Sequence, residues 1–321
     1  MDENALTRLR EIFGTQLQEN VHMSNYTTIN IGGAADALLI LNSAASIERA
    51  ITELWQLEIP FLILGSGSNV LISDQGIREV VIINHAHNLK IITNGAQNKV
   101  WAESGSILSQ VARQAGWRGL TGLEWAAAIP GTVGGAVYGN AGAFGRDISC
   151  NLTLAEILHH KNGKENWSNE RLAFTYRSSL LKRNPEDTVI LSATFNLEHG
   201  ELDEIKARMD DYRQKRMSNQ PPGASMGSVF CNPPEQKAGQ LIEAVGLKGK
   251  SIGMAEISPT HANFIINTSV ATAQDILDLI ELCQRKVEDQ MNVHLTPEIQ
   301  FIGEWDETQK KKINMITGGI G

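Results

Sequence analysis

The chain has 321 residues, of which 42% are hydrophobic and 20% are charged, and its formal net charge is -8. This length predicts two domains with enough apolar material for buried cores. The negative charge argues against nucleic acid or an anionic membrane as a partner, although a local basic pocket for a phosphorylated ligand remains compatible with it.

The cysteines indicate a reducing compartment. Cys150, Cys231 and Cys283 are odd in number and show no CxxC spacing, which predicts neither a disulfide framework nor a zinc site. Residues 1–13 lack the apolar stretch of a signal peptide, and no apolar run is long enough to span a membrane. We therefore expect a cytoplasmic protein.

Hydrophobic periodicity predicts alternating helices and strands over the first 120 residues. Residues 46–57 have apolar side chains at helical spacing, with Ser46 as a candidate N-cap. Pro60 ends this helix, and a buried strand at 61–64 leads into a Gly/Ser loop. The other elements predicted here are a helix at 5–13, strands at 30–40, 80–84, 89–93 and 99–103, and a helix at 108–115.

The second half of the chain contains a hairpin, a linker and a long helix. Asn162-Gly163 is the expected turn of a hairpin over 152–167. Residues 220–223 resemble a linker, and the tail from Gly303, with Lys310 to Lys312, is expected to be disordered. The remaining predictions are strands at 189–197, 263–267 and 294–302, and helices at 202–216, 236–245 and 272–290.

Two glycine-rich segments are candidates for a ligand site. Residues 65–69 (Gly-Ser-Gly-Ser-Asn) follow a strand, and their amides could bind an anion. The segment matches neither GxGxxG, because Val70 occupies the sixth position, nor a P-loop. Residues 129–145 have side chains small enough for the main chain to lie against a flat ligand, with amides free to donate. A tight turn and a close-packed structural segment are the alternatives.

Further motifs follow in a specific order. They are Phe174-Thr175-Tyr176-Arg177-Ser178-Ser179, Gly227-Ser228-Val229-Phe230-Cys231-Asn232-Pro233, His261-Ala262-Asn263-Phe264 and Leu295-Thr296-Pro297-Glu298-Ile299. Together with the glycine-rich segments they resemble the UDP-N-acetylenolpyruvoylglucosamine reductase (MurB) family over about residues 25–303. The absence of room for an extra tyrosine-bearing loop between 193 and 220 resembles the shorter branch of that family.

The resemblance implies an α+β fold. A two-subdomain FAD-binding module, similar to that of vanillyl-alcohol oxidase and related (PCMH) flavoproteins, is expected over residues 1–200, divided at about 85 and 86. A smaller α+β substrate domain is expected at 201–303, followed by the tail at 304–321. The active site is expected in the cleft between the domains.

The resemblance also implies an activity, which is reduction of UDP-N-acetylglucosamine enolpyruvate to UDP-N-acetylmuramate by NADPH through FAD. The loop at 65–69 contains no His or Cys, so we expect non-covalent FAD. No nucleic acid or membrane partner is expected, and the protein is expected to be a monomer. The residues implied in FAD binding are Gly65, Ser66, Gly67, Ser68, Asn69, Pro130, Gly131, Thr132, Gly134, Gly135, Asn140, Ala141 and Gly142.

Three residues match the family's catalytic positions. Arg177 would hold the substrate carboxylate, because a guanidinium stays charged and offers two donors. Ser228 would deliver a proton, and Glu298 would assist as the enolate develops. Tyr176, Arg216 and Asn232 are expected to bind substrate. Cys231 stands where the family usually has Lys, and Arg216, Lys215 or Lys237 could replace that cation.

Other interpretations remain open. The chain could be a flavin oxidoreductase of the same fold that acts on another substrate, or a UDP-sugar-binding regulator without turnover. From local sequence, Arg177 could also be a surface ion-pair residue, Ser228 a turn residue and Glu298 a solvated carboxylate. His85 and His87 lack a third ligand in the sequence, so no metal site is predicted.

Overall fold

A computed structural model of the chain describes residues 1–93, 98–185 and 188–319. Its contacts separate two compact units, and neither is a continuous stretch of sequence. The first unit contains residues 1–39, 66–81 and 219–321, and the second contains residues 40–65 and 82–218. The change of unit at 218 and 219 lies just before the predicted linker at 220–223, and residues 1–39 and 66–81 join the C-terminal residues in one unit.

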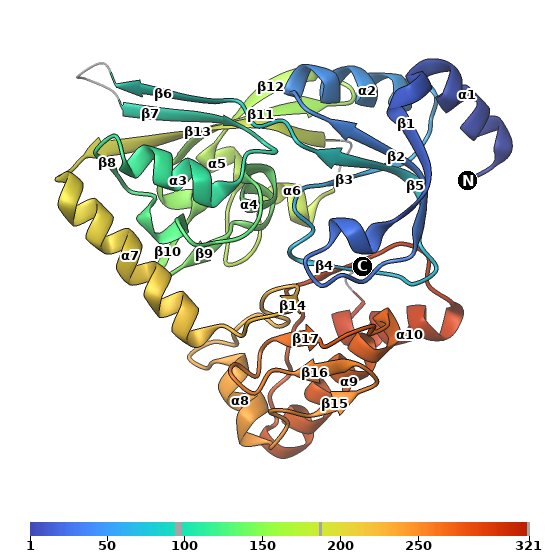
Figure 1. The fold of residues 1–321 in the computed structure, drawn as a ribbon, viewed down its shortest axis with the longest axis vertical. Coiled ribbons are helices and arrows are strands. Elements are labelled where there is room, and N and C mark those ends of the chain that lie inside the picture. Colours follow the sequence, from blue (N-terminus) through green and yellow to red (C-terminus); the bar gives the residue numbers. More distant parts are fainter. Residues whose placement is uncertain (94–97, 186–187, 320–321) are drawn as a thin grey trace. The chain divides into compact units, whose positions relative to one another are not determined.

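A helix and a four-stranded sheet come first in the chain (Figure 1). The strand order is β1-β2-β5-β3, and β1 is antiparallel to β2. Nearly all side chains of β2 and most of those of β5 are at least partly buried, which is typical of central strands. The elements are α1 (Glu3–Phe13), β1 (Leu17–His22), β2 (Ala34–Leu41), α2 (Ala44–Gln56), β3 (Phe61–Leu64), β4 (Val70–Ile72) and β5 (Ile77–Asn84).

The prediction that Ser46 caps α2 is wrong by one turn. Ser43 is the N-cap, because its backbone is extended and its side chain accepts a hydrogen bond from the Ser46 amide. Ser46 closes the capping box from inside the helix. Ser43, the first serine of Asn-Ser-Ala-Ala-Ser at 42–46, was the capping signal that the sequence analysis missed.

The C-terminal part of the first unit contains a four-stranded antiparallel sheet of order β14-β17-β16-β15. The long helix α9 begins at Ala273, and the side chain of Thr272 caps it together with Asp275. Its predicted apolar stripe is buried, including Ile276, Ile280 and Val287. The elements are β14 (Ala224–Ser225), α8 (Ala238–Ala244), β15 (Ser251–Ile252), β16 (Ala255–Ile257), β17 (Ile265–Asn267), α9 (Ala273–Met291), β18 (Gln300–Ile302) and α10 (Glu307–Thr317).

The expectation of a disordered tail is wrong, because residues 307–317 form α10. Asp306 caps the helix, and Ile316 is buried. The Lys312 ammonium pairs with Asp278 and Glu281 of α9, at 2.7 Å from the latter. The lysine run looked like a solvated tail, but these acidic partners are about 30 residues away in sequence and only the fold brings them to it.

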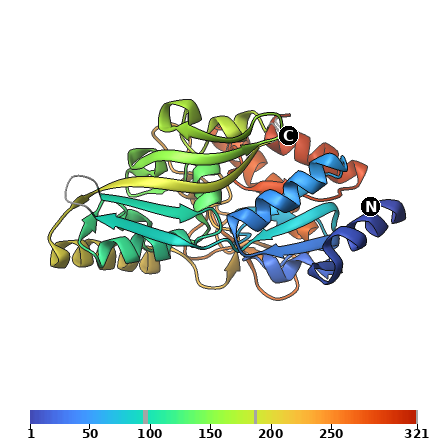
Figure 2. The ribbon, with the colours of Figure 1, turned by 90° about the horizontal axis from the view of Figure 1, so that it is seen from above.

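The second unit is built on a six-stranded sheet of order β12-β11-β13-β7-β6, with β8 also paired to β13. Figure 2 shows the long strands β6, β7 and β13 side by side. The predicted hairpin is confirmed, but its turn is formed by residues 160–162 rather than by Asn162-Gly163, because Gly163 already pairs with His159. The elements are β6 (Leu89–Thr93), β7 (Asn98–Glu103), α3 (Leu108–Gly116), β8 (Leu120–Thr121), α4 (Val133–Gly139), β9 (Gly142–Ala143), β10 (Arg146–Asp147), β11 (Leu152–His159), β12 (Gly163–Ser168), α5 (Asn169–Leu172), α6 (Leu180–Arg183), β13 (Thr188–His199) and α7 (Leu202–Asn219).

The core of this unit is apolar and contains Trp125 and Phe195, which are 1% and 0% exposed. Among the described residues, no helix combines the length and apolar character needed to cross a lipid bilayer.

Candidate active site

Two carbonyl groups of the Gly/Ser loop between β3 and β4 accept hydrogen bonds from other segments of the chain. Gly67 O accepts from the Thr28 amide at 3.1 Å, and Asn69 O accepts from the Gln300 amide at 3.0 Å. Gly67 is left-handed, with φ +59°, and a Cβ there would lie 2.1 Å from Tyr26 O. Within the described part of the chain, the amides of Ser66 and Ser68 have no protein acceptor. The loop therefore fits an anion such as a diphosphate.

The second glycine-rich segment forms the short helix α4, which the sequence analysis did not predict. Thr132 caps it and accepts from the Gly135 amide at 3.4 Å. The Gly134 amide donates to Ser104 O at 2.7 Å. The expectation of free amides is therefore wrong at Gly134 and at Gly135. A Cβ at Gly65 would lie 2.4 Å from Thr132 Oγ1, so this glycine lets the two segments touch.

Asn140 links α4 to the turn that carries Arg177. It ends the helix in the left-handed conformation, with φ +44°. Its buried amide donates to Thr175 O at 3.0 Å and to an Asp147 carboxylate oxygen at 3.1 Å. Its carbonyl oxygen accepts from the Ser149 amide at 3.2 Å. The implied contact of Asn140 with FAD stays a prediction, and the structure shows that its side chain holds this turn.

Arg177 lies in a tight turn against the glycine-rich segment. Thr175 and Ser178 exchange backbone hydrogen bonds of 2.9 and 3.1 Å around it. The Arg177 Nη2 atom donates to Gly142 O at 2.8 Å, and the guanidinium carbon lies 5.2 Å from the centre of the Tyr176 ring. Tyr176 is 56% exposed. The Gly142 contact fixes one edge of the guanidinium.

Ser228 and Glu298 belong to two segments that pair with each other in the first unit. The Glu298 amide donates to Val229 O at 2.8 Å, and the Cys231 amide donates to Thr296 O at 2.9 Å. The strand predicted over 294–302 is regular only at 300–302, where β18 runs parallel to β4. Residues 294–299 make a single bridge, Pro297 to Phe230, and no longer ladder.

Asn69 joins the Gly/Ser loop to this pair of segments. Its side-chain amide donates to Glu298 O at 3.1 Å, while its own carbonyl accepts from Gln300. Asn263 contacts the Ser228 segment from its other side, a role that sequence reasoning missed. The only sequence signal was a polar residue between the apolar neighbours Ala262 and Phe264 in a quoted motif.

Arg216 lies at the C-terminal end of α7. Burial lowers the pKa of its guanidinium to about 10, so it still carries its charge at neutral pH. Among the described residues its guanidinium makes no hydrogen bond or ion pair. Lys215, the neighbouring candidate, pairs with Asp211 at 2.7 Å. Of these two cations, Arg216 is the one available to a ligand.

The position of α7 in the second unit is set by a buried carboxylate. Arg208 donates to Glu124 at 2.8 Å, and the Glu124 side chain is only 8% exposed. Burial by itself would raise the pKa of Glu124. Hydrogen bonds from the Thr121 hydroxyl, from its own backbone N–H and from Arg208 outweigh the effect of burial, so the pKa is lowered. Ile205 and Met209 are buried on the same helix. These contacts fix the helix that carries Arg216.

Asn232 and the substituted Cys231 follow Ser228 in the chain. The Asn232 side-chain oxygen accepts from the Ala238 amide at 3.1 Å, at the start of α8. Cys231 is partly buried. The structure therefore uses one end of the Asn232 side chain to order the segment after Ser228.

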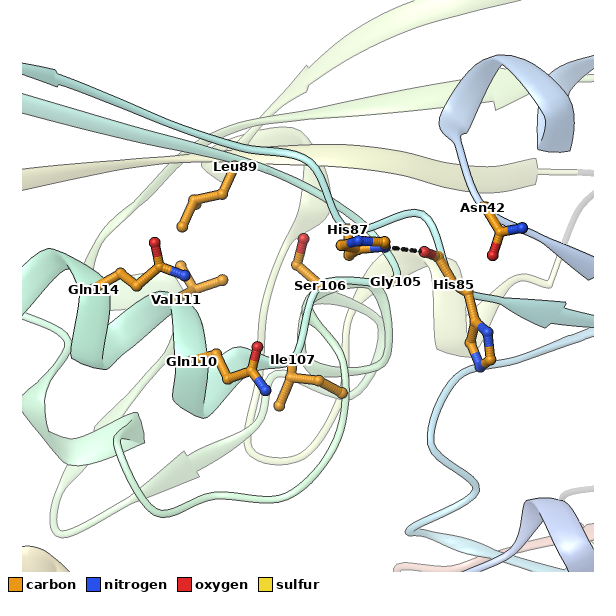
Figure 3. Close-up of a pocket in the computed structure, with 10 residues that line it drawn as sticks. All are labelled: Asn42, His85, His87, Leu89, Gly105, Ser106, Ile107, Gln110, Val111 and Gln114. Atoms are coloured by element: carbon orange, nitrogen blue, oxygen red, sulfur yellow. Dashed lines mark hydrogen bonds between the residues drawn. The ribbon is translucent and has the colours of Figure 1, made fainter.

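A separate cavity of about 390 Å³ lies in the second unit and contains none of the predicted site residues (Figure 3). His85 and His87 line it, and the His87 ring is hydrogen-bonded to His85 O at 2.6 Å. Across the residues that the structure describes, no three His, Cys, Asp or Glu side chains gather as they would around a metal ion.

Two parts of the sequence match the models of known protein families. Residues 35–164 match the FAD binding domain, and residues 218–302 match the UDP-N-acetylenolpyruvoylglucosamine reductase C-terminal domain. These matches confirm the predicted α+β fold with an FAD-binding module and a smaller C-terminal domain.

Relatives and a solved structure agree with these matches. UDP-N-acetylenolpyruvoylglucosamine reductase of Clostridium novyi is 43% identical over 293 residues, 91% of this chain and 94% of the relative. The protein of the same name from Caldanaerobacter subterraneus is 41% identical over 307 residues, 95% of this chain and all of the relative. The crystal structure of UDP-N-acetylenolpyruvylglucosamine reductase (MurB) from Thermus caldophilus has a TM-score of 0.75 at 33% identity, covering 88% of this chain and 97% of that one. The chain therefore belongs to the UDP-N-acetylenolpyruvoylglucosamine reductase family.

Proposed function

We propose that this chain reduces the enolpyruvyl ether of UDP-N-acetylglucosamine to the lactyl ether of UDP-N-acetylmuramate, with FAD as its cofactor and NADPH as the reductant. The observation that carries the proposal is the pairing of the Ser228 and Glu298 segments, joined through Asn69 to an anion-binding loop. These three features come from sequence stretches far apart, and the reaction needs a proton donor close to a bound dinucleotide.

FAD fits the residues of this chain. The unpaired amides of Ser66 and Ser68 would bind its diphosphate. Gly65 contacts Thr132 so closely that no side chain fits at position 65. When bound, FAD would pass the hydride that comes from NADPH to the terminal carbon of the substrate. No His or Cys occurs among residues 65–69, which favours non-covalent binding.

Arg177 would hold the carboxylate of the enolpyruvyl group. Negative charge builds on this group as the hydride arrives, and a cation positioned in advance stabilises that charge. The Gly142 carbonyl fixes one Nη atom, so the guanidinium needs little reorganisation when it grips the carboxylate. Tyr176, over half exposed beside it, would contact the substrate.

Ser228 would donate the proton that completes the reduction. A serine hydroxyl is a weak acid, so it acts only on a strongly basic carbon and in a tightly defined position. Glu298 would assist as the enolate forms, and the hydrogen bond from its amide to Val229 O ties its backbone to the Ser228 segment.

Arg216 would bind the diphosphate of the substrate, in place of the lysine that Cys231 replaces. A partly buried guanidinium without a carboxylate partner gains more from an incoming phosphate than a surface cation does, because it has already lost part of its hydration. Asn232 would add a hydrogen bond to the substrate.

The reaction would place the protein in peptidoglycan precursor synthesis, which supports cell shape and division. A cytoplasmic location and a monomeric state are part of the same proposal. Sedimentation of the purified protein at several concentrations would test the monomer.

An anaerobic titration tests the function. Flavin absorbance should bleach on addition of NADPH and return on addition of UDP-N-acetylglucosamine enolpyruvate. Bleaching without recovery would point to another substrate of the same fold. Protein that neither carries flavin nor takes up FAD would contradict the proposal.

A further inference from the structure

Phe230 needs hydrogen-bond partners on the side away from Glu298. The Phe230–Pro297 bridge is flanked by hydrogen bonds from Cys231 to Thr296 and from Glu298 to Val229, so Phe230 and Pro297 form a non-hydrogen-bonded pair. The N–H and C=O groups of Phe230 therefore point away from residues 296–298. Phe230 is 1% exposed, and leaving these groups unpaired there would be costly.

The side chain of Asn263 satisfies both groups. Its amide donates to Phe230 O at 2.8 Å, and its carbonyl oxygen accepts from the Phe230 amide at 2.9 Å. Its backbone carbonyl also accepts from the Val229 amide at 2.8 Å. Asn263 therefore takes the place of a neighbouring strand along the two residues that follow Ser228.

Asn263 is itself held firmly. It is 4% exposed, and its backbone N–H donates to Nδ1 of His261 at 3.2 Å. Burial lowers the pKa of His261, which favours the neutral ring that can accept this bond. A Cβ at Gly239 would lie 2.9 Å from the His261 ring, so the ring is packed closely. The carboxamide consequently has little freedom to follow a displaced Phe230.

We propose that Asn263 is a positioning residue for the Ser228 hydroxyl in the proposed proton transfer. The segment 229–231 is fixed by Asn263 on one side and by residues 296–298 on the other, and Ser228 directly precedes it. Displacing this segment moves the proton donor away from its acceptor carbon while the rest of the protein stays folded. The inference rests on the proposed function and deepens it.

The test uses Asn263→Asp, which keeps the size and the acceptor but replaces the donor to Phe230 O with a second oxygen. The matched control is Asn267→Asp. Asn267 is also buried in the first unit, donates to Ile29 O at 3.0 Å, and accepts from Ser269 and Ala271, so the same kind of bond is lost away from Ser228. Flavin content and thermal unfolding are measured for both variants.

The decisive readouts are the two half-reactions, followed by stopped-flow absorbance. With Asn263→Asp, reoxidation at saturating substrate should slow by about 10- to 100-fold, because a displacement near 1 Å costs that much in oriented reactions. Reduction by NADPH and the substrate KM should stay within about twofold of wild type, as should all rates of Asn267→Asp.

A double variant separates positioning from general damage. If Asn263 acts through Ser228, the combination of Asn263→Asp with Ser228→Ala should be no slower in reoxidation than Ser228→Ala alone. Multiplicative losses would overturn the inference, as would equal slowing by Asn267→Asp or wild-type reoxidation by Asn263→Asp.

If Asn263→Asp fails to fold, Asn263→Ser is the second variant, because it removes both hydrogen bonds to Phe230 without adding a charge. It should fold, bind FAD and show the same selective loss. Loss of flavin in both Asn263 variants, with Asn267→Asp intact, would make Asn263 purely structural and reject the inference. Wild-type flavin that the substrate cannot reoxidise would instead reject the proposed function itself.

Discussion

The Ser228 and Arg177 regions hold their side chains in different ways. In the first unit, residues 69, 229, 263 and 298 are joined by hydrogen bonds to backbone groups, and each partner comes from a distant stretch of sequence. In the second unit, Arg177 rests on a glycine-rich segment 35 residues away, through Gly142 and the left-handed Asn140. Hydrogen-bond networks are sensitive to a lost donor, and close backbone contacts are sensitive to an added carbon.

Ser228→Ala tests the first region and should have the largest effect. Loss of the proton donor should slow flavin reoxidation by substrate by about 10²- to 10⁴-fold, while reduction by NADPH is unchanged. Stopped-flow absorbance measures both steps. Ser218→Ala, at an exposed serine near the end of α7, is the control. Unchanged reoxidation would remove Ser228 from the mechanism.

Arg177→Lys tests the second region. Lysine keeps the charge but cannot bind Gly142 O and grip a carboxylate with a planar fork, so reoxidation should slow by about 10²- to 10³-fold. Arg171→Lys is the control, since Arg171 is an exposed residue of the same unit that pairs with Glu165. Equal rates for the two variants would mean that Arg177 does not contact the substrate.

Gly65→Ala tests the sensitivity to an added carbon. The new Cβ would lie 2.4 Å from Thr132 Oγ1, and overpacking of this kind costs about 1–3 kcal/mol. FAD affinity, measured by flavin fluorescence, should fall about 10- to 100-fold. Gly139→Ala is the control, because nothing lies within 4 Å of its Cβ and FAD binding should not change. Normal affinity in Gly65→Ala would show that the loop can shift at no cost.

Arg216→Met should have a smaller effect. The KM for substrate should rise several-fold, and kcat should change little. Since burial disfavours the charged guanidinium, the same variant should unfold at an equal or higher temperature without ligand. Arg213→Met, at an exposed residue paired with Asp210, is the control for KM. A lower unfolding temperature would mean that Arg216 is held by the protein rather than reserved for ligand.

The lowered pKa of His261 predicts a small effect of pH on the stability of the first unit. Its pKa is lowered by burial, so the unfolded chain binds more protons than the folded one between the folded pKa and the ordinary value near 6.5. Its contribution to stability is complete above that value and is lost as the pH falls. The unfolding temperature should therefore drop less between pH 7 and 5 in His261→Gln than in wild type. Equal slopes would contradict this assignment.

The elements of the fold were largely readable from sequence. Apolar residues at helical spacing predicted α9, a helix was also predicted at 202–216 where α7 lies, and the Asn-Gly sequence at 162–163 predicted the β11–β12 hairpin. Two errors share one cause. The strand over 294–299 and the tail that forms α10 depend on contacts with distant residues, and periodicity along one segment does not carry that information. The cap of α2 was a local signal at Ser43 that the sequence analysis missed.

The roles of Arg177, Ser228 and Glu298 remain predictions that the sequence made through its ordered motifs, and the structure adds how each is held. Asn140 illustrates the difference, because the motif predicts a contact with the cofactor, whereas the structure shows the hydrogen bonds of its side chain to Asp147, Ser149 and Thr175.

The sequence by itself determined the family, the FAD-binding character and the order of the elements, because motif spacing and hydrophobic period are local properties of the chain. Only the tertiary structure decided that residues 1–39 and 66–81 join the C-terminal residues in one unit, and that Asn263 acts as a strand partner for Phe230. Both depend on hydrogen bonds between groups tens to hundreds of residues apart, and the pairing of such groups is set by chain topology.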